Sequence, residues 1–375
     1  MIATETQSAD PAATWASTVF KYERQFDCCG FSPCGKYVFA GAYDGTVQRW
    51  TLDGDEQTAG AGHHGWVTDL AFHPDGVHLF SVDTWGRLCC RAYASADLKP
   101  KWDVPQAHAN WIRALAVSPD GALVATAGND QVVRLWNAAD GKPVRDLAGH
   151  ASEIYSLAFH PTDGSLVSGD LTGVVKHWNV TTGKPVRDID ASVLYVRQHD
   201  LYDSGAVRDL AFSGDGQQLV CSGITNLKGS TVAGFPGVVQ IDWKSGKQTE
   251  LLRPKDHEVE YKVHGVFVEG VTFHSDGFLI GVGGNGERAG AMWFWKLDGA
   301  EPFHEIQKLP GGRDISIHPD GLRLAVAQFE PNGRGINGGN GRKTKEGEYY
   351  SHDGVVRIYE MTPRPEKAGD AKPKG

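Results

Sequence analysis

Apolar and polar residues alternate in short runs along most of the chain, and the runs are separated by Pro, Asp and Gly. The repeating unit is an alternating run, a turn of the Pro-Asp-Gly type and a second alternating run. Seven copies occur, which read GFSPCGKYVFAGA, AFHPDGVHLFSVD, AVSPDGALVATAG, AFHPTDGSLVSGD, AFSGDGQQLVCSG, TFHSDGFLIGVGG and SIHPDGLRLAVAQ. Alternation with period two in residues such as Val, Leu and Phe predicts β-strands, and no segment has a sustained helical period.

The spacing of the turn glycines fixes the architecture. They lie about 40 to 45 residues apart, with longer intervals after Gly164 and Gly216. Each unit also contains a later run such as VVRLWNAADGK (132–142), which predicts a third strand, and a fourth such as KPVRDLAGH (142–150). The pattern therefore predicts an all-β fold, a seven-bladed β-propeller of four-stranded antiparallel blades.

The units resemble the WD-repeat (WD40-type) family. That family has a Gly-His pair before its first strand, an Asp in the turn between the second and third strands, and a Trp at the end of the third. The matching residues here are Gly62-His63, Gly149-His150, His108 and His264 for the pair, Asp44, Asp130 and Asp353 for the turn, and Trp50, Trp136, Trp178 and Trp295 for the tryptophan. The resemblance covers residues 15–362 and implies a scaffold that binds other proteins.

The resemblance also implies a hydrogen-bonded chain inside a blade. The third unit supplies all four of its members, His108, Thr126, Asp130 and Trp136. The fourth supplies His150, Ser168 and Trp178, with Thr172 in the position of the Asp. A Ser-His-Asp catalytic triad is the alternative interpretation, but a triad should occur once and in a cleft. Partial copies recur at the repeat spacing, so we expect these residues to satisfy buried polar groups.

The ring is expected to close through its N-terminal segment. The seventh unit lacks a fourth strand, because its third strand is followed by a Pro-, Lys- and Gly-rich tail. Residues 17–24, STVFKYER, can supply that strand and shelter the open edge. The predicted organisation is a flexible N-terminus over 1–14, the propeller over 15–362 and a disordered tail over 363–375.

Charge and cysteine usage restrict the partners and the compartment. The 375 residues carry a formal charge of −9, which argues against nucleic acid and anionic membranes as partners. We find no apolar stretch long enough to span a bilayer and no signal peptide, and we expect a cytoplasmic monomer. The cysteines, including Cys28, Cys29 and Cys34, occupy ordinary repeat positions without metal-site spacing, so no metal or cofactor is expected. The turn histidines His73, His160, His274 and His318 are spread around the ring and cannot converge on one ion.

Two features indicate a binding face. The longest insertions all belong to loops of one face, in units four to seven. The aligned starts of the innermost strands lie on that face and read Asp27, Thr68, Arg113, Tyr155, Arg208, Glu269 and Arg313. Trp66 and Trp111 come two residues earlier in their units. Arginine, tyrosine and tryptophan dominate binding energy at interfaces, so this set predicts an unidentified protein or peptide partner with an acidic or phosphorylated segment.

Two alternatives to that binding face stay open. The arginines can instead pair with Asp27, Glu269, Asp69 or Asp209, while the tryptophans pack under loops. The rival function is a hydrolase-like propeller enzyme with a metal or catalytic site at the central pore. Such a site would use Asp27 and Glu269, or histidines of the inserted loops at positions His199, His257, His264 and His352.

Overall fold

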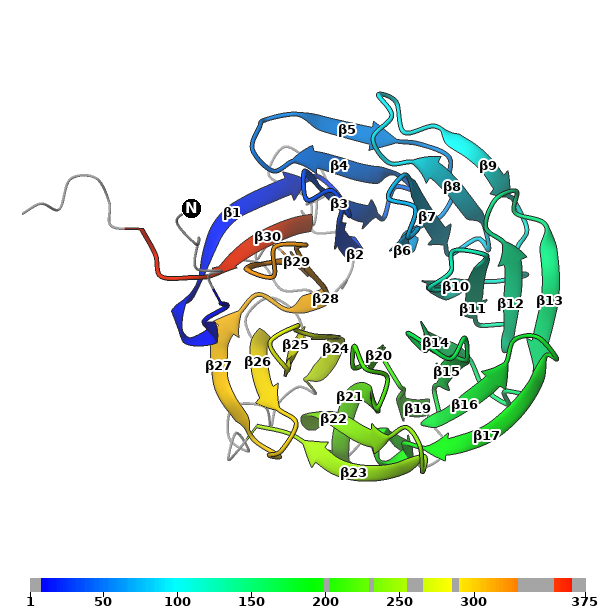
Figure 1. Cartoon of the computed structure of the whole chain (residues 1–375), viewed down its shortest axis with the longest axis vertical. Coiled ribbons are helices and arrows are strands. Elements are labelled where there is room, and N and C mark those ends of the chain that lie inside the picture. Colours follow the sequence, from blue (N-terminus) through cyan, green and yellow to red (C-terminus); the bar gives the residue numbers. More distant parts are fainter. Residues whose placement is uncertain are drawn as a thin grey trace, which may run out of the picture.

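The strands form a closed ring (Figure 1). Residues of the innermost strands line a cavity at the centre of the ring, here called the central channel. The computed structural model describes residues 8–198, 202–228, 233–254, 266–284, 290–329 and 354–365. In these ranges there is no α-helix, and the only helical elements are two short 3₁₀ turns, η1 (Pro11–Ala13) and η2 (Ser192–Leu194). None of the helices found there has the length and apolar character needed to cross a membrane.

Seven four-stranded antiparallel sheets make up the ring within the described residues, which confirms the predicted fold class. Each blade runs outward from an innermost strand a to an outermost strand d. Blade 1 contains β2 (Phe26–Phe31), β3 (Tyr37–Ala42), β4 (Val47–Thr51) and β5 (Gln57–Gly60), and blade 2 contains β6 (Val67–Phe72), β7 (His78–Asp83), β8 (Leu88–Ala92) and β9 (Pro100–Val104). Blade 3 contains β10 (Ile112–Val117), β11 (Leu123–Gly128), β12 (Val132–Asn137) and β13 (Pro143–Ala148), and blade 4 contains β14 (Ile154–Phe159), β15 (Leu166–Asp170), β16 (Val174–Asn179) and β17 (Lys184–Asp190).

The second half of the ring repeats this order. Blade 5 contains β20 (Leu210–Phe212), β21 (Gln218–Lys228), β22 (Ala233–Asp242) and β23 (Lys247–Leu252), and blade 6 contains β24 (Phe267–Phe273), β25 (Phe278–Gly284), β26 (Gly290–Lys296) and β27 (Pro302–Leu309). Between blades 4 and 5, β18 (Tyr195–Gln198) and β19 (Tyr202–Gly205) form a separate two-stranded sheet. The remainder of the long insertions, including most of 329–354, lies outside the described residues.

The N-terminal strand completes the last blade, as predicted. Blade 7 has the order β1 (Thr14–Tyr22), β30 (Gly354–Met361), β29 (Arg323–Phe329) and β28 (Gly312–Ile317). The pairing of β1 with β30 runs antiparallel from Thr14 opposite Met361 to Tyr22 opposite Gly354. Figure 1 shows the blue first strand beside the red last one. The first and the last strand of the described residues therefore pair in one sheet.

The apolar core lies between neighbouring blades. One cluster joins Phe26 and Trp50 of blade 1 to Ala325 and Val356 of blade 7, and the ring of Phe20 on β1 stacks on Trp50 with centroids 5.6 Å apart. Cys28, Cys29, Cys89, Cys90 and Cys221 are buried free thiols, and Cys34 is exposed. A buried thiol behaves as a small apolar group. Four of the five buried cysteines, Cys28, Cys29, Cys90 and Cys221, accordingly pack in such clusters.

Candidate partner-binding face

The starts of the seven innermost strands meet at one mouth of the channel. A cavity of about 200 Å³ opens there, and all seven aligned positions line it: Asp27, Thr68, Arg113, Tyr155, Arg208, Glu269 and Arg313. The antiparallel topology places the b–c and d–a loops around this mouth, since strand a begins where strand d has just ended. These residues occupy the equivalent position in each blade. The structure thus brings together residues that lie up to 286 positions apart in the sequence.

The carboxylates nearest to the arginines of the mouth lie at long nitrogen–oxygen distances. Glu269 lies between Arg208 and Arg313, with its carboxylate oxygens 3.9 Å from Arg208 Nε and 3.6 Å from Arg313 Nη1. Arg113 Nε donates to Asn129 Oδ1 at 2.6 Å, and its Nη2 lies 3.5 Å from Glu153. The alternative of arginine–carboxylate pairing is therefore correct for Glu269, at distances longer than a strong hydrogen bond.

The other acidic residues of the channel wall connect neighbouring backbone segments through hydrogen bonds. Asp69, Asp209 and Asp314 each accept a backbone N–H of the next residue and a second N–H from strand a of another blade, at 2.7 to 2.9 Å: Leu115, Val271 and Cys29 respectively. Burial raises the pKa of Asp209 to about 6 and that of Asp314 to about 7, although these N–H groups act in the opposite direction. Asp69 and Asp209 thus join blades and do not pair with the arginines.

Aromatic rings and guanidinium groups form a continuous row along the mouth. Tyr43 stacks on Trp66 with centroids 4.2 Å apart and planes 5° apart, and Trp66 lies 5.6 Å from Trp111. Arg113 then lies over both Trp111 and Tyr155, and Arg208 over both Tyr155 and Phe267, at 4.3 to 5.2 Å from the ring centroids. Each contact of this kind adds a favourable electrostatic term. The row therefore holds the exposed side chains in fixed orientations.

Three tryptophans on this face are exposed to solvent. The exposed fraction is 40% for Trp66, 37% for Trp111 and 68% for Trp85. The alternative in which Trp66 and Trp111 pack beneath loops is therefore wrong within the described residues. Exposed tryptophans grouped beside arginines are typical of protein-interaction surfaces. Trp85 has no counterpart in the predicted site, because it lies in a b–c turn and not at the start of a strand a.

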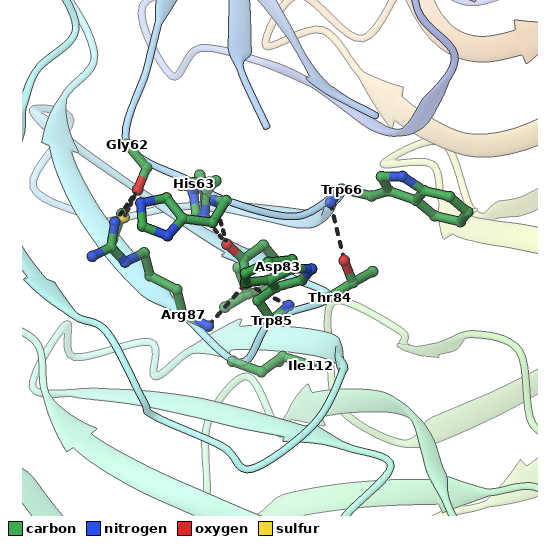
Figure 2. Close-up of polar contacts among 12 residues, drawn as sticks. Gly62, His63, Trp66, Asp83, Thr84, Trp85, Arg87 and Ile112 are labelled. Atoms are coloured by element: carbon green, nitrogen blue, oxygen red, sulfur yellow. Dashed lines mark hydrogen bonds and ion pairs between the residues drawn. The ribbon is translucent and has the colours of Figure 1, made fainter. Parts of the chain in front are cut away.

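A buried carboxylate and a hydroxyl hold the backbone of two of these tryptophans, Trp85 and Trp66, in place (Figure 2). Asp83 Oδ1 accepts the backbone N–H groups of Trp85 and Arg87, both at 2.9 Å, and Oδ2 accepts that of His64 at 3.2 Å. Thr84 Oγ1 accepts the N–H of Trp66 at 3.0 Å. One turn of blade 2 therefore fixes the backbone that carries both Trp66 and Trp85, so the aromatic surface needs little ordering on binding.

A turn carboxylate also belongs to the hydrogen-bonded chain predicted inside the blades. In blade 3, His108 Nε2 lies 2.7 Å from Thr126 Oγ1, its Nδ1 lies 2.9 Å from Asp130, and Trp136 Nε1 donates to Thr126 at 2.8 Å. The predicted chain is confirmed there. Burial lowers the pKa of His108, despite its hydrogen bond to the Asp130 carboxylate, which acts to raise it.

Blade 4 corrects one detail of that prediction. His150 bonds Ser168 at 2.6 Å, and Trp178 donates to Ser168 at 2.7 Å, as expected. The carboxylate comes from Asp170, 2.8 Å from His150 Nδ1, and Thr172 only donates to Asp170. Asp170 is the first residue of the turn, whereas Asp130 is the third residue of the corresponding turn in blade 3. Either turn position reaches the imidazole, so alignment on the third position missed Asp170.

Blade 2 forms the same chain with a different donor. His63 lies 2.7 Å from Ser81 Oγ and 3.0 Å from Asp83. Blade 2 therefore also combines a histidine, a hydroxyl and a carboxylate, a combination that the sequence predicted only for the third unit. Arg91 takes the place of the tryptophan and donates to Ser81 at 2.6 Å. Chains of this kind in three consecutive blades, all buried, support a structural task and argue against a single catalytic triad.

The channel mouth also bears on the rival enzyme. Asp27 accepts a hydrogen bond from Tyr43 at 2.9 Å, and burial raises its pKa although Arg313 acts to lower it. Glu269 has two arginines beside it, which disfavours a bound cation. No histidine is found among the lining residues that the structure describes. The side chains of His199, His257, His264 and His352 lie outside the described residues.

Comparison with known sequences identifies the type of repeat in the first four blades. The model of the WD domain, G-beta repeat, matches residues 22–51, 56–90, 102–137 and 141–179, which cover blades 1 to 4. The three later blades have the same strand order and pairing. Blades 1 to 4 therefore match WD40 repeats, and the ring as a whole has the form of a WD40-type β-propeller. The similarity to known members of that family is distant.

Two curated relatives illustrate that distance. Over 102 residues, 25% of this chain, the WD40 propeller is 34% identical to the small ribosomal subunit protein RACK1y of Oryza sativa subsp. japonica. Over 94 residues, also 25% of the chain, it is 32% identical to the lissencephaly-1 homolog 1 of Paramecium tetraurelia. The matched stretch spans only 27% of the first relative and 22% of the second.

Proposed function

We propose that this WD40 propeller is a protein-interaction scaffold whose partner docks on the face with the channel mouth. The observation that carries the proposal is the exposure of Trp66, Trp85 and Trp111 beside the arginine-lined cavity. Asp83 and Thr84 fix the backbone of Trp85 and Trp66. A rigid aromatic surface loses little conformational entropy when a partner covers it, so it can contribute much of the binding energy.

The charge of the mouth favours an acidic side chain or phosphate on the partner. Arg113 and Arg208 flank the ring of Tyr155, and Arg208 Nε has no hydrogen-bond partner among the described residues. Because Glu269 lies 3.9 Å from Arg208 Nε, this guanidinium can still donate a hydrogen bond to a ligand. An incoming carboxylate or phosphate would accept from it in the fork geometry that arginine offers. We accordingly place an anionic group of the partner at Arg113 and Arg208, with Arg313 as the third cation of the mouth.

The experiment is a peptide selection with a matched counter-selection. Random peptides displayed on phage are selected on the wild type, and their affinities are then measured for the wild type and for Trp66→Ala/Trp111→Ala by fluorescence anisotropy. We expect the selected peptides to contain an acidic residue and to lose about 30-fold or more in affinity for the double variant, as hot-spot residues do.

Val77→Ala provides the control, because Val77 is 50% exposed in an a–b turn on the opposite face. It should leave the affinity unchanged. Peptides that bind the tryptophan variant as tightly as the wild type would refute the proposed face. Selected peptides that bind equally well after Asp and Glu are changed to Asn and Gln would refute the anionic part of the proposal. Thermal melts confirm that each variant is folded.

The expected setting of the scaffold is the cytoplasm. All six cysteines are free thiols, and five of them are buried. A reducing compartment keeps such thiols in this form. With a net charge of −9, we expect the partner to be a protein and not a nucleic acid or an anionic membrane.

A further inference from the structure

The a–b turn of blade 2 carries a group of metal-ligand side chains on the face opposite the channel mouth. His73, Asp75 and His78 each offer one ligand atom, and these atoms lie within 4.8 Å of one another. Nδ1 of His73 is 3.1 Å from Asp75 Oδ2, and Nδ1 of His78 is 2.6 Å from the same oxygen. All three side chains are partly exposed, so an ion and a water molecule have access to them.

Hydrogen bonds orient two of these ligands. His73 Nε2 lies 2.8 Å from the carbonyl oxygen of Gly121 in the next blade. A carbonyl only accepts, so Nε2 carries the proton and Nδ1 keeps its lone pair, which is the arrangement usual for a metal-binding histidine. Asp75 Oδ1 accepts the N–H groups of Val77 and His78 at 2.7 and 3.1 Å, and this leaves Oδ2 directed at the imidazoles. Burial acts to raise the pKa of Asp75, but the hydrogen bond with the His78 side chain and those with these two N–H groups together lower it, so Asp75 is ionised at neutral pH.

The other histidine turns show what is special about blade 2. His160, His274 and His318 also bond the carbonyl of a glycine in the following blade, but the residues that close their turns are Ser165, Phe278 and Arg323. In blade 7 the guanidinium of Arg323 lies 2.9 Å from Asp320 and 3.2 Å from His318 Nδ1. The chain itself therefore places a cation against the His and Asp of that turn. In blade 2 a histidine stands where the arginine stands in blade 7.

We propose that His73, Asp75 and His78 bind a divalent transition-metal ion, with Zn²⁺ as the first candidate. Two imidazoles and one carboxylate with a water as the fourth ligand is a common zinc set. Bonds of about 2.0 Å in a tetrahedron separate the ligand atoms by about 3.3 Å. The distances of 3.1 and 2.6 Å to Asp75 Oδ2 need only small adjustments to meet that separation. The ion would tie the end of β6 to the start of β7.

Two groups compete with the ion. The backbone N–H of Asp75 donates to His73 Nδ1 at 3.0 Å, and on metal binding this N–H would turn to solvent, since Asp75 is exposed. Lys101 Nζ lies 3.0 Å from His78 Nε2, and its positive charge repels an incoming cation. Lys101 is an exposed side chain on β9 and can swing away. Lys101→Met should therefore tighten binding.

The test uses the tag-free full-length chain, stripped with a chelator and titrated with ZnCl₂ by calorimetry. His78→Arg copies the residue of the blade 7 turn and is therefore expected to fold. We expect it to bind one zinc ion fewer than the wild type, while Lys101→Met binds the same number with higher affinity. His304→Gln, which alters a partly exposed histidine on β27, is the matched control and should not change the titration.

A converse variant tests the turn geometry directly. Arg323→His gives blade 7 the spacing of His73, Asp75 and His78, and we expect it to bind one zinc ion more than the wild type. Cobalt in place of zinc reports tetrahedral coordination through its visible absorption. The proposal is overturned if the wild type takes up no zinc, or if His78→Arg binds as many ions with the same affinity. Failure of Arg323→His to gain an ion would contradict the claim that this turn supplies the geometry.

Discussion

Arg91 donates from Nη1 to Ser81 Oγ at 2.6 Å, in the register position that Trp136 and Trp178 hold in the next two blades. The arginine side chain is fully buried, and it also donates to the carbonyl oxygens of Leu98 and Ala61. A guanidinium thus satisfies three acceptors where the indole satisfies one. The buried charge is tolerated because each group around it accepts a hydrogen bond.

Removal of that side chain should destabilise the propeller. Arg91→Ala removes the donor to the buried carbonyl oxygen of Leu98 and to the partly buried one of Ala61. An unsatisfied buried acceptor costs about 1–3 kcal/mol. We expect the free energy of unfolding to fall by about 2–5 kcal/mol, as measured by urea denaturation. Arg145→Ala, which removes an exposed arginine of blade 3, should change it by less than about 0.5 kcal/mol. Equal losses in the two variants would contradict the structural task of Arg91.

The correction in blade 4 gives a paired prediction. Asp170 accepts from His150 and from the backbone of Thr172 and Val174, whereas Thr172 contributes only a donor to Asp170. Asp170→Ala should lower the free energy of unfolding by about 2–4 kcal/mol and Thr172→Val by less than about 1 kcal/mol. Chemical denaturation of the two variants measures the difference. The reverse order would restore Thr172 as the blade 4 equivalent of Asp130.

Closure of the ring can be tested with neighbouring residues of β1. Phe20 packs on Trp50 of blade 1, while Val19 is 40% exposed. Phe20→Ala should lower the free energy of unfolding by about 2–3 kcal/mol, since it removes part of an interface between blades. Val19→Ala should change it by less than about 0.5 kcal/mol. Thermal unfolding that is equally insensitive to both substitutions would show that β1 does not fasten the ring.

The channel carboxylates predict an unusual pH dependence. Burial raises the pKa of Asp314 from its ordinary 3.8 to about 7. Between these values the folded state holds a proton that the unfolded state has lost, so this group makes the protein less stable as pH rises. Asp314→Asn cannot titrate. The free energy of unfolding of the wild type minus that of the variant should therefore be more positive at pH 5 than at pH 8, by about 1–2 kcal/mol.

Denaturant titrations at the two pH values measure this difference. Asp75→Asn is a useful comparison, because the pKa of Asp75 is lowered and its contribution has the opposite pH dependence. For that residue the stabilising effect is present above pH 3.8 and is lost as the pH falls further. A stability difference for Asp314→Asn that is the same at pH 5 and pH 8 would mean that Asp314 is ionised throughout.

The repeat pattern made the fold predictable from the sequence. The binding face was predicted only in part, because several of its residues lie in turns whose hydrogen bonds the repeat pattern does not determine. Alternation and turn glycines give seven units of four strands, and the missing fourth strand of the last unit requires β1. Alignment also identifies the starts of the inner strands, so Arg113 and Arg208 could be placed at the mouth. It does not identify Trp85, Asp83 or Asp170, because hydrogen bonds within each b–c turn decide which turn residue faces the histidine and which faces solvent.

The pairing of β1 with β30 also constrains how the chain is made. The indole of Trp15 donates to the carbonyl oxygen of Thr362, a residue 347 positions later. At a synthesis rate of about 5–20 residues per second, the first strand leaves the ribosome roughly 20–70 s before its partner exists. During that interval the aromatic residues of β1 and the edge they cover are open to other chains. Protection of the nascent N-terminal strand is therefore part of what this ring requires of the cell.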